Sequence, residues 1–396
     1  MPVTWTLLIV LALAAAGFYL GRSRALAAAQ GDSRKLHSRT SYYGWNIALF
    51  TAVPALFLIA IWSFAQPDVN RTVLAGVALI LAAAGMAWSL SRTAPDFRAR
   101  NVVETFVRFL LILCSSIAIL TTAGIVLSML FETGHFFQQY PWQDFLFGTT
   151  WSPRFGGGSQ LGILPLVWGT LYISLIALAV SIPIGLFAAI YMSEYASPRL
   201  RSIAKPAIEV LAGIPTIVYG LFALITVGPM LRDYFAQPLG LGSSGSSVMT
   251  AGLVMGIMLI PFVSSLSDDI INAVPQSLRD GALGLGSTPS ETVRKVVLPA
   301  ALPGIVGAVL LAASRAIGET MIVVLGAGAS AQMSLNPFEA MTTITVKIVS
   351  QLTGDSDFNS PETLVAFALG LTLFVITLAL NVVALYIVRK YREQYE

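Results

Sequence analysis

The apolar stretch around residue 315 contains two oppositely charged residues. Positions 313–320 read ASRAIGET, between the apolar runs PGIVGAVLLA and MIVVLGAGA. Arg315 and Glu319 are four residues apart, so one continuous helix would present them on the same face and within reach of each other. A charge at the centre of a bilayer costs roughly 2.5–3.5 kcal/mol on insertion scales, so we expect both side chains to face the protein interior.

Two interpretations of this pair are open. In the first, Arg315 and Glu319 neutralise each other and only pack the helices together. In the second, the planar guanidinium of Arg315 binds a tetrahedral oxyanion through two hydrogen bonds, and Glu319 holds the arginine when no anion is present. Ser314 and Thr320 lie beside the pair and add hydroxyl donors, which favours the second interpretation. The sequence leaves open whether Arg315 contacts a cargo.

The composition is that of an integral membrane protein. Of 396 residues, 56% are hydrophobic and only 11% are charged, with a mean hydropathy of +0.78. The net charge of +3 does not indicate nucleic acid, because membrane proteins carry basic loops on their cytoplasmic side. The single cysteine, Cys114, allows no internal disulfide, and no cluster of Cys and His suggests a metal. We therefore predict that the chain contacts membrane lipid and binds neither a metal nor nucleic acid.

The chain is predicted to be an all-α polytopic membrane protein. A helix needs roughly 20 apolar residues to cross the hydrocarbon core. Nine segments satisfy this requirement, namely 4–20, 43–65, 72–90, 105–131, 164–191, 206–231, 248–272, 303–327 and 363–388.

The basic residues predict the orientation of these spans. If the N-terminus lies outside, 17 of the 23 basic residues fall on the inner side. Only Arg71, Arg154, Arg232 and Lys347 fall on the outer side. Because cytoplasmic loops carry the excess of Lys and Arg, we expect the N-terminus outside and the C-terminus in the cytoplasm.

The organisation changes near residue 103. Residues 1–103 contain three spans, and residues 104–396 contain six, with a long inner connection at 273–302. Within that connection Thr288 precedes Pro289, which is typical of a helix start. A short amphipathic helix on the membrane surface is one interpretation of this segment. Asp268 and Asp269, just before it, are expected to face a cytoplasmic vestibule or to cap the connection.

The spacing of residues in the connection favours a different interpretation. It resembles the EAA motif of binding-protein-dependent ABC importer permeases, in which this loop forms two coupling helices that dock onto a cytoplasmic ATPase. Asp280 and Gly281 stand where that family usually has Glu and Ala. The resemblance implies a tight turn at Gly286 and an end to the second helix at Pro299. The predicted coupling residues are Asp280, Ala282, Gly286, Val296, Leu298 and Pro299.

Three further stretches resemble the phosphate-specific branch of that family. They are FLFGTTWSPRFGGGSQLGILPLVWGTL (145–171), AGIPTIVYGLFAL (212–224) and SRAIGETM (314–321). The resemblance covers about residues 100–396. It implies a six-helix type I ABC importer permease core, preceded here by about three extra transmembrane helices with no assigned transport role. It also implies that this core carries inorganic phosphate across the bacterial inner membrane.

The same resemblance implies the partners of the chain. They are a second phosphate permease subunit, a dimer of ATPase subunits and a periplasmic phosphate-binding protein. The sequence has no G-x-x-x-x-G-K-[ST] motif to hold the phosphates of ATP. We therefore expect no cofactor and no catalytic residue on this chain, with ATP used by the partner ATPase.

Proline and glycine within the predicted spans indicate where a transport pathway runs. Pro215 removes a backbone hydrogen bond and is predicted to kink the span 206–231. Freed backbone groups are tolerated only where protein or a water-filled cavity satisfies them. We therefore predict that Pro215, Thr216 and Tyr219 line the pathway with Arg315, although proline is frequent in membrane helices generally.

Other functions remain as alternatives. A permease of the same fold for sulfate or molybdate differs only in substrate. An ion-driven secondary transporter or channel is disfavoured by the EAA spacing and by the absence of internal repeats. An intramembrane enzyme is disfavoured because the sequence has neither HExxH nor GxSxG.

Overall fold

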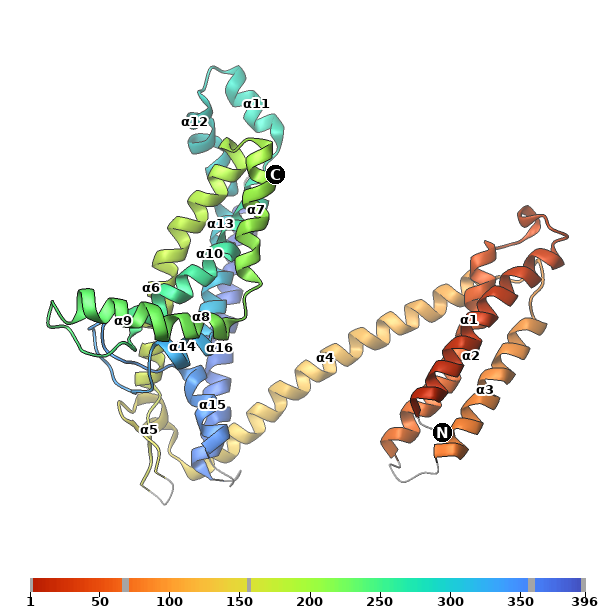
Figure 1. Ribbon diagram of the computed structural model, residues 1–396, viewed down its shortest axis with the longest axis horizontal. Coiled ribbons are helices and arrows are strands. Elements are labelled where there is room, and N and C mark those ends of the chain that lie inside the picture. The colour runs from red at the N-terminus through yellow and green to blue at the C-terminus, as the bar shows by residue number, and fades with distance from the viewer. Residues whose placement is uncertain (1–2, 66–70, 155–157, 355–359, 393–396) are drawn as a thin grey trace. The chain divides into compact units, whose positions relative to one another are not determined.

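A computed structural model describes residues 3–65, 71–154, 158–354 and 360–392. The chain forms two compact units, Met1–Ala123 and Gly124–Glu396, and each is described by itself. Almost all of the regular structure is helical (Figure 1). Among the described residues, nine helices are long and apolar enough to cross a membrane, which confirms the predicted all-α polytopic fold. The predicted domain boundary at residue 103 stays a prediction.

The first unit is a bundle of three long helices and the beginning of a fourth. Their apolar contacts centre on small and β-branched side chains such as Val10, Ala55 and Ala78. The buried Tyr43 hydroxyl donates to the carbonyls of Pro95 and Phe97, at 3.0 and 2.9 Å, and so fixes the loop that leads out of the bundle. The elements are α1 Val3–Ala28, a 3₁₀ turn Ser33–Lys35, α2 Thr40–Ala65, α3 Arg71–Ser91 and the beginning of α4 Ala99–Gln139.

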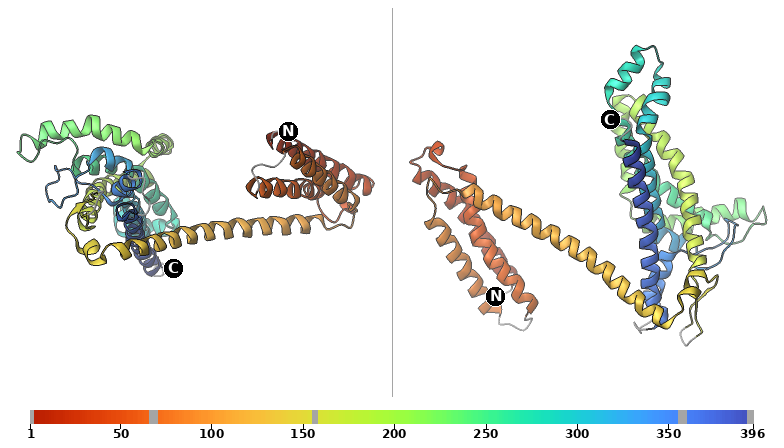
Figure 2. Two further views of the ribbon diagram at one scale, coloured as in Figure 1. Left: turned by 90° about the horizontal axis from the view of Figure 1, so that it is seen from below. Right: turned by 180° about the vertical axis from the view of Figure 1, so that it is seen from behind.

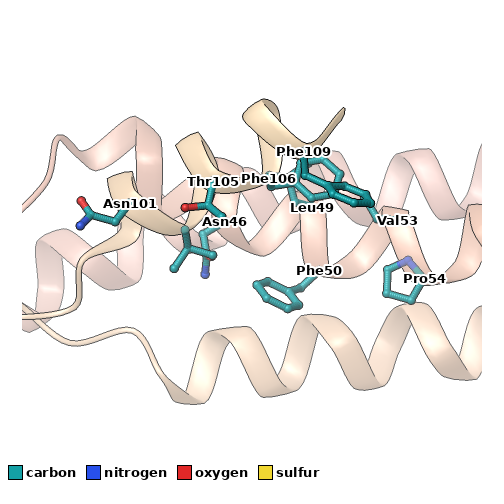
Figure 3. A pocket seen from close by; sticks show the side chains of 10 residues that line it. Asn46, Leu49, Phe50, Val53, Pro54, Asn101, Thr105, Phe106 and Phe109 are labelled. Atoms are coloured by element: carbon teal, nitrogen blue, oxygen red, sulfur yellow. The ribbon is translucent and has the colours of Figure 1, made fainter. Parts of the chain in front are cut away.

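A groove of about 600 Å³ lies between α2 and the beginning of α4. Figure 3 shows Asn101, Thr105 and Asn46 toward one end of it, and Val53 and Pro54 toward the other. None of its ten lining residues is titratable. The groove therefore lacks the charged groups that the chemistry predicted around residue 315 requires.

The second unit holds the remaining elements, and α16 runs along much of its length (Figure 2). Four of its segments are π-helical turns, a geometry that often occurs at functional sites. The helices are α5 Trp142–Phe147, α6 Leu164–Ile190, α7 Pro198–Ala212, α8 Thr216–Phe222, α9 Gly228–Leu231, α10 Val248–Ala273, α11 Gln276–Gly284, α12 Pro289–Thr292, α13 Leu298–Ile317, α14 Met321–Gly326, α15 Ile344–Gly354 and α16 Pro361–Arg392. The π turns are Tyr191–Tyr195, Ala223–Val227, Arg232–Ala236 and Val293–Val297. The strands β1 Trp151–Ser152 and β2 Gln160–Leu161 pair antiparallel, with Trp151 opposite Leu161.

Helix α10 is the central element of the second unit. Its apolar residues form the main core together with those of α6, α8 and α14. The amides at its first turn have no partner within the helix, and the loop before α15 satisfies two of them. Val248 donates to the carbonyl of Glu339 at 3.0 Å, and Met249 donates to that of Pro337 at 2.8 Å.

Two predicted spans are interrupted in the structure. The predicted span 206–231 is split, because α7 ends at Ala212 and α8 begins at Thr216. The predicted span 303–327 is split in the same way between Ile317 and Met321. The prediction that Pro215 only kinks a helix is therefore wrong. A proline lacks the amide donor and also drives the residue before it out of helical geometry, so the helix ends rather than bends.

A glycine allows α6 to lie directly against the loop before α15. A Cβ atom on Gly169 would lie 2.1 Å from the carbonyl oxygen of Thr342. We expect Gly169→Ala to lower the free energy of unfolding by about 1–3 kcal/mol, because backbone would have to move. Thermal unfolding in detergent measures this, with Gly134→Ala as the control because its Cβ would meet no atom within 4 Å. Equal melting temperatures for the two variants would contradict the close approach.

Candidate functional site

The two helix interruptions are packed together. Helices α8 and α14 each begin just after an interruption, and Figure 1 shows both in the middle of the second unit. They touch at Gly220, where a Cβ atom would lie 2.8 Å from the carbonyl oxygen of Met321. The beginnings of the two helices therefore lie in one region.

The charged pair is not arranged as predicted. Helix α13 ends at Ile317 with Gly318 as its C-cap, so Glu319 is not on the same helix as Arg315. Its carboxylate instead accepts hydrogen bonds from the amides of Met321, at 3.0 Å, and Ile322, at 3.4 Å. The prediction of a same-face pair is wrong, because an acidic side chain at a helix start satisfies free amide donors.

Arg315 is left without an acidic partner. Among the residues that the structure describes, no carboxylate forms an ion pair with it. The side chain is exposed, and its Cζ atom lies 5.7 Å from the centre of the Phe262 ring. Ser314 and Thr320 are half-buried beside it, and the Thr320 hydroxyl donates to the carbonyl of Gly318 at 3.4 Å. The guanidinium donors are therefore available to an external group.

The residues after the first interruption have different surroundings. Pro215 is exposed and is the N-cap of α8, while Thr216 is half-buried at its first position. Tyr219 is buried, and its hydroxyl donates to the carbonyl of Leu211 at 2.8 Å. Tyr219 thus ties α8 to the end of α7. Whether these three residues line a pathway stays a prediction.

The cap at Glu319 predicts a difference between two substitutions. Glu319→Ala removes both hydrogen bonds to the start of α14 and should cost about 1 kcal/mol of stability. Glu319→Gln keeps an acceptor oxygen and should cost less, as measured by thermal unfolding in detergent. If Gln is as destabilising as Ala, the negative charge and not the cap is what the site requires.

The predicted coupling loop forms two helices at the end of the unit where α16 also finishes (Figure 1). Gly286 has φ +88° and ends α11, as the predicted turn requires. The amide of Ser287 donates to the carbonyl of Ala282, and the amide of Gly286 to that of Leu283, which is a Schellman motif. Thr288 caps α12 and forms a capping box with Glu291, so the predicted helix start is confirmed.

The predicted helix end at Pro299 is wrong. Helical structure continues without interruption from α12 through the π turn into α13, from Pro289 to Ile317. In the π turn the amide of Leu298 donates to the carbonyl of Val293, one residue further back than in an α-helix. This wider turn accommodates a proline, which has no amide to donate. Pro299 is half-buried, as are Val296 and Leu298.

Exposed leucines mark the tip of the coupling loop. Leu285 is 91% exposed, and Leu278 and Leu283 on α11 are also exposed. Asp280 is exposed beside them, and Ala282 is half-buried. These leucines are not among the predicted coupling residues, although apolar side chains in an otherwise polar loop are a sequence signal for an interaction surface. Exposed apolar residues of this kind mark interaction surfaces.

The carboxylate of Asp268 lies buried near the same end of the second unit. Asp268 on α10 is fully buried, and the guanidinium of Arg201 donates to both of its oxygens, at 3.0 and 2.9 Å. The ammonium of Lys205 donates to Asp268 at 2.8 Å and to Asp269 at 3.2 Å. Asn272 also donates to Asp268, at 2.9 Å. We call these five residues the Asp268 cluster.

The charges of the Asp268 cluster balance. Two basic and two acidic side chains contribute, and the hydrogen bond with Asp268 raises the pKa of Lys205. A buried carboxylate is tolerated only when it is paired and hydrogen-bonded in this way. Of the two alternatives for Asp268, the vestibule is therefore excluded for this buried side chain. The spacing of Arg201 and Lys205, one helical turn apart, was the sequence signal for a common partner.

A second buried ion pair connects the coupling loop to this region. Arg279 on α11 donates to the carboxylate of Glu194 at 2.9 Å, and both side chains are less than one-sixth exposed. Its guanidinium also donates to the carbonyls of Val274 and Ile271, at 2.6 and 2.8 Å. Arg279 therefore holds α11 to the last turn of α10.

Residues 181–393 match the family described as the binding-protein-dependent transport system inner membrane component. The chain belongs to this family. The matched region contains both helix interruptions, the coupling loop, Arg315 and the Asp268 cluster. Residues 7–73 match a second family, described as phosphate ATP-binding cassette transporter. The chain is therefore a multi-pass inner-membrane component of a transport system.

Curated relatives have the same character. The chain is 38% identical over 251 residues to phosphate transport system permease protein PstC 1 of Mycobacterium bovis, covering 59% of this chain and 74% of that protein. It is 32% identical over 300 residues to PstC of Xylella fastidiosa, covering 71% and 89%. Among solved structures, a chain of the inward-facing MetNI methionine ABC transporter matches with a TM-score of 0.41 and 19% identity, covering 58% of this chain and 94% of that one.

Proposed function

We propose that this permease family member carries inorganic phosphate across the inner membrane as one subunit of an ATP-driven importer. The observation that carries the proposal is the state of Arg315. This arginine lies in the last turn of α13, and its guanidinium has no acidic partner among the described residues. A guanidinium fork matches the oxygens of a tetrahedral oxyanion. The relatives named for phosphate transport make phosphate the first candidate among such anions.

The unpaired arginine suits passage better than tight binding. Glu319 has its own hydrogen bonds to the start of α14, and its carboxylate lies a few residues further along the chain. Phosphate near neutral pH carries between one and two negative charges and needs a cationic group to cross a low-dielectric region. We infer that the Glu319 carboxylate, four residues along the chain, repels an anion held by Arg315, so that the anion can leave.

The proposed partners follow from the exposed surfaces. Around the interruptions, α8 and α14 expose Ile217, Val218, Leu221 and Met321, an apolar face suited to a second permease subunit. The exposed leucines of the coupling loop suit a groove on a cytoplasmic ATPase dimer, which would hydrolyse ATP in place of this chain. A periplasmic phosphate-binding protein would deliver the anion at the outer side. With the coupling loop inside, the N-terminus lies outside and the C-terminus in the cytoplasm.

The substrate is tested by uptake into proteoliposomes that contain the assembled complex. ATP-dependent accumulation of labelled phosphate should exceed that of sulfate and molybdate. Arg315→Ala should lower phosphate uptake about 10–100-fold, the equivalent of charge-assisted hydrogen bonds worth ~1.5–3 kcal/mol, and Arg315→Lys should lower it less. Arg232→Gln is the matched control. Arg232 lies outside α13, in the π turn Arg232–Ala236, and already pairs with Asp233.

Three outcomes separate the alternatives. Uptake of sulfate or molybdate in place of phosphate would identify a permease of the same fold for another oxyanion. Uptake driven by an ion gradient without ATP would identify a secondary transporter. Full phosphate uptake by both Arg315 variants would return this residue to a packing role.

The coupling loop has its own test. The left-handed conformation of Gly286 costs a residue with a side chain about 1–2 kcal/mol, so Gly286→Val should distort the turn and reduce retention of the ATPase in a pull-down. Gly281→Ala is the control, because its Cβ would meet no atom within 4 Å. Membrane insertion of both variants is checked by fractionation. Undiminished retention of the ATPase by Gly286→Val would contradict the assignment of this loop.

A further inference from the structure

Helix α7 is attached to the second unit in an unusual way. None of its residues is buried, and no α7 side chain belongs to the apolar clusters of the described residues. Yet α7 leads directly into the interruption at residues 213–215. Since apolar packing does not hold α7, its position depends on polar contacts.

The Asp268 cluster supplies those contacts. Arg201 and Lys205 both project from α7 onto the one buried carboxylate of α10, with four nitrogen–oxygen distances between 2.8 and 3.2 Å when Asp269 is included. These side chains of α7 are about one-third exposed, whereas that of Asp268 is not exposed at all. The Asp268 cluster is thus anchored on α10, and it positions α7.

The coupling loop is fixed to the same end of α10. Arg279 of α11 binds the carbonyls of Ile271 and Val274, which follow Asp268 within two helical turns. Asn272 directly follows Ile271 in the last turn of α10, and it donates to Asp268 and accepts from Arg201 at 3.3 Å. Polar contacts therefore attach both α11 and α7 to the same end of α10.

We propose that Asp268 is a positioning residue that transmits movement of the coupling loop to α7, and through α7 to the interruption before α8. Movement of α11 reaches α10 through Arg279, and the Asp268 cluster carries it to α7. At the far end of α7, the hydrogen bond from Tyr219 to Leu211 carries it to α8. This inference rests on the transport function proposed above.

Transport coupling tests the inference in the assembled complex. Asp268→Asn keeps the shape of the side chain but removes the charge that binds Arg201 and Lys205. Phosphate taken up per ATP hydrolysed should fall about tenfold, within the range typical of coupling between sites, while ATP hydrolysis stays within about twofold of the wild type. Asp233→Asn is the matched control, because Asp233 is half-exposed, pairs with Arg232 and lies outside the Asp268 cluster, so its ratio should equal that of the wild type.

Hydrogen exchange tests the attachment of α7 by the Asp268 cluster, and it does not depend on transport. Backbone amides of residues 202–212 should exchange about tenfold faster in Asp268→Asn than in the wild type or in Asp233→Asn, as expected for a segment that has lost its attachment. If Asp268→Asn does not assemble, Lys205→Met removes a contact of the same cluster at the partly exposed Lys205. Phosphate uptake per ATP should again fall, and amide exchange in α7 should again become faster.

The two proposals fail in different ways. A wild-type complex that takes up no phosphate would overturn the proposed substrate. The exchange experiment would still test whether the Asp268 cluster attaches α7. Normal phosphate uptake per ATP in Asp268→Asn, or unchanged exchange in α7, would overturn the positioning role. Loss of ATP hydrolysis in Asp268→Asn in parallel with uptake would also overturn it, because the residue would then support docking or folding and not transmission.

Discussion

In a membrane-embedded bundle, every backbone group freed by an interrupted helix must find a partner within the protein. The second unit meets this requirement at each of its two interruptions with a side chain. The Tyr219 hydroxyl takes up the carbonyl of Leu211, and the Glu319 carboxylate takes up two amides of α14. The Thr345 hydroxyl then binds the carbonyl of Glu319 at 2.9 Å, which fixes the connection between α13 and α14. These bonds determine where α8 and α14 can lie.

Arg315 lies close in sequence to one of these side chains but is not paired with it. Glu319 caps α14 and forms no ion pair with Arg315, whose guanidinium lies beside the Phe262 ring with no acidic partner among the described residues. At the other end of the unit the opposite solution is found, since the buried Asp268 is saturated by Arg201, Lys205 and Asn272. An unpaired charge next to a helix interruption is typical of a functional site, and a saturated one is typical of a mechanical or structural joint.

Several features followed directly from the sequence. The nine apolar segments, the start of α12 at Thr288 and the turn at Gly286 depend on local composition and local backbone geometry, and all three are present. Three expectations were wrong for one shared reason. The kink at Pro215, the Arg315–Glu319 pair and the helix end at Pro299 each assumed regular α-helical geometry, whereas the chain uses helix interruptions and π turns.

What the sequence determined by itself is therefore the membrane class, the number of spans and the family, because hydropathy and motif spacing are local or cumulative properties. Only the tertiary structure decided which charged groups are partners. Glu319 lies four residues from Arg315 in the sequence and caps another helix, while Asp268 lies more than sixty residues from Arg201 and binds it through both oxygens. Burial decides these pairings, since a carboxylate removed from water takes the nearest donors in space, whatever their distance along the chain.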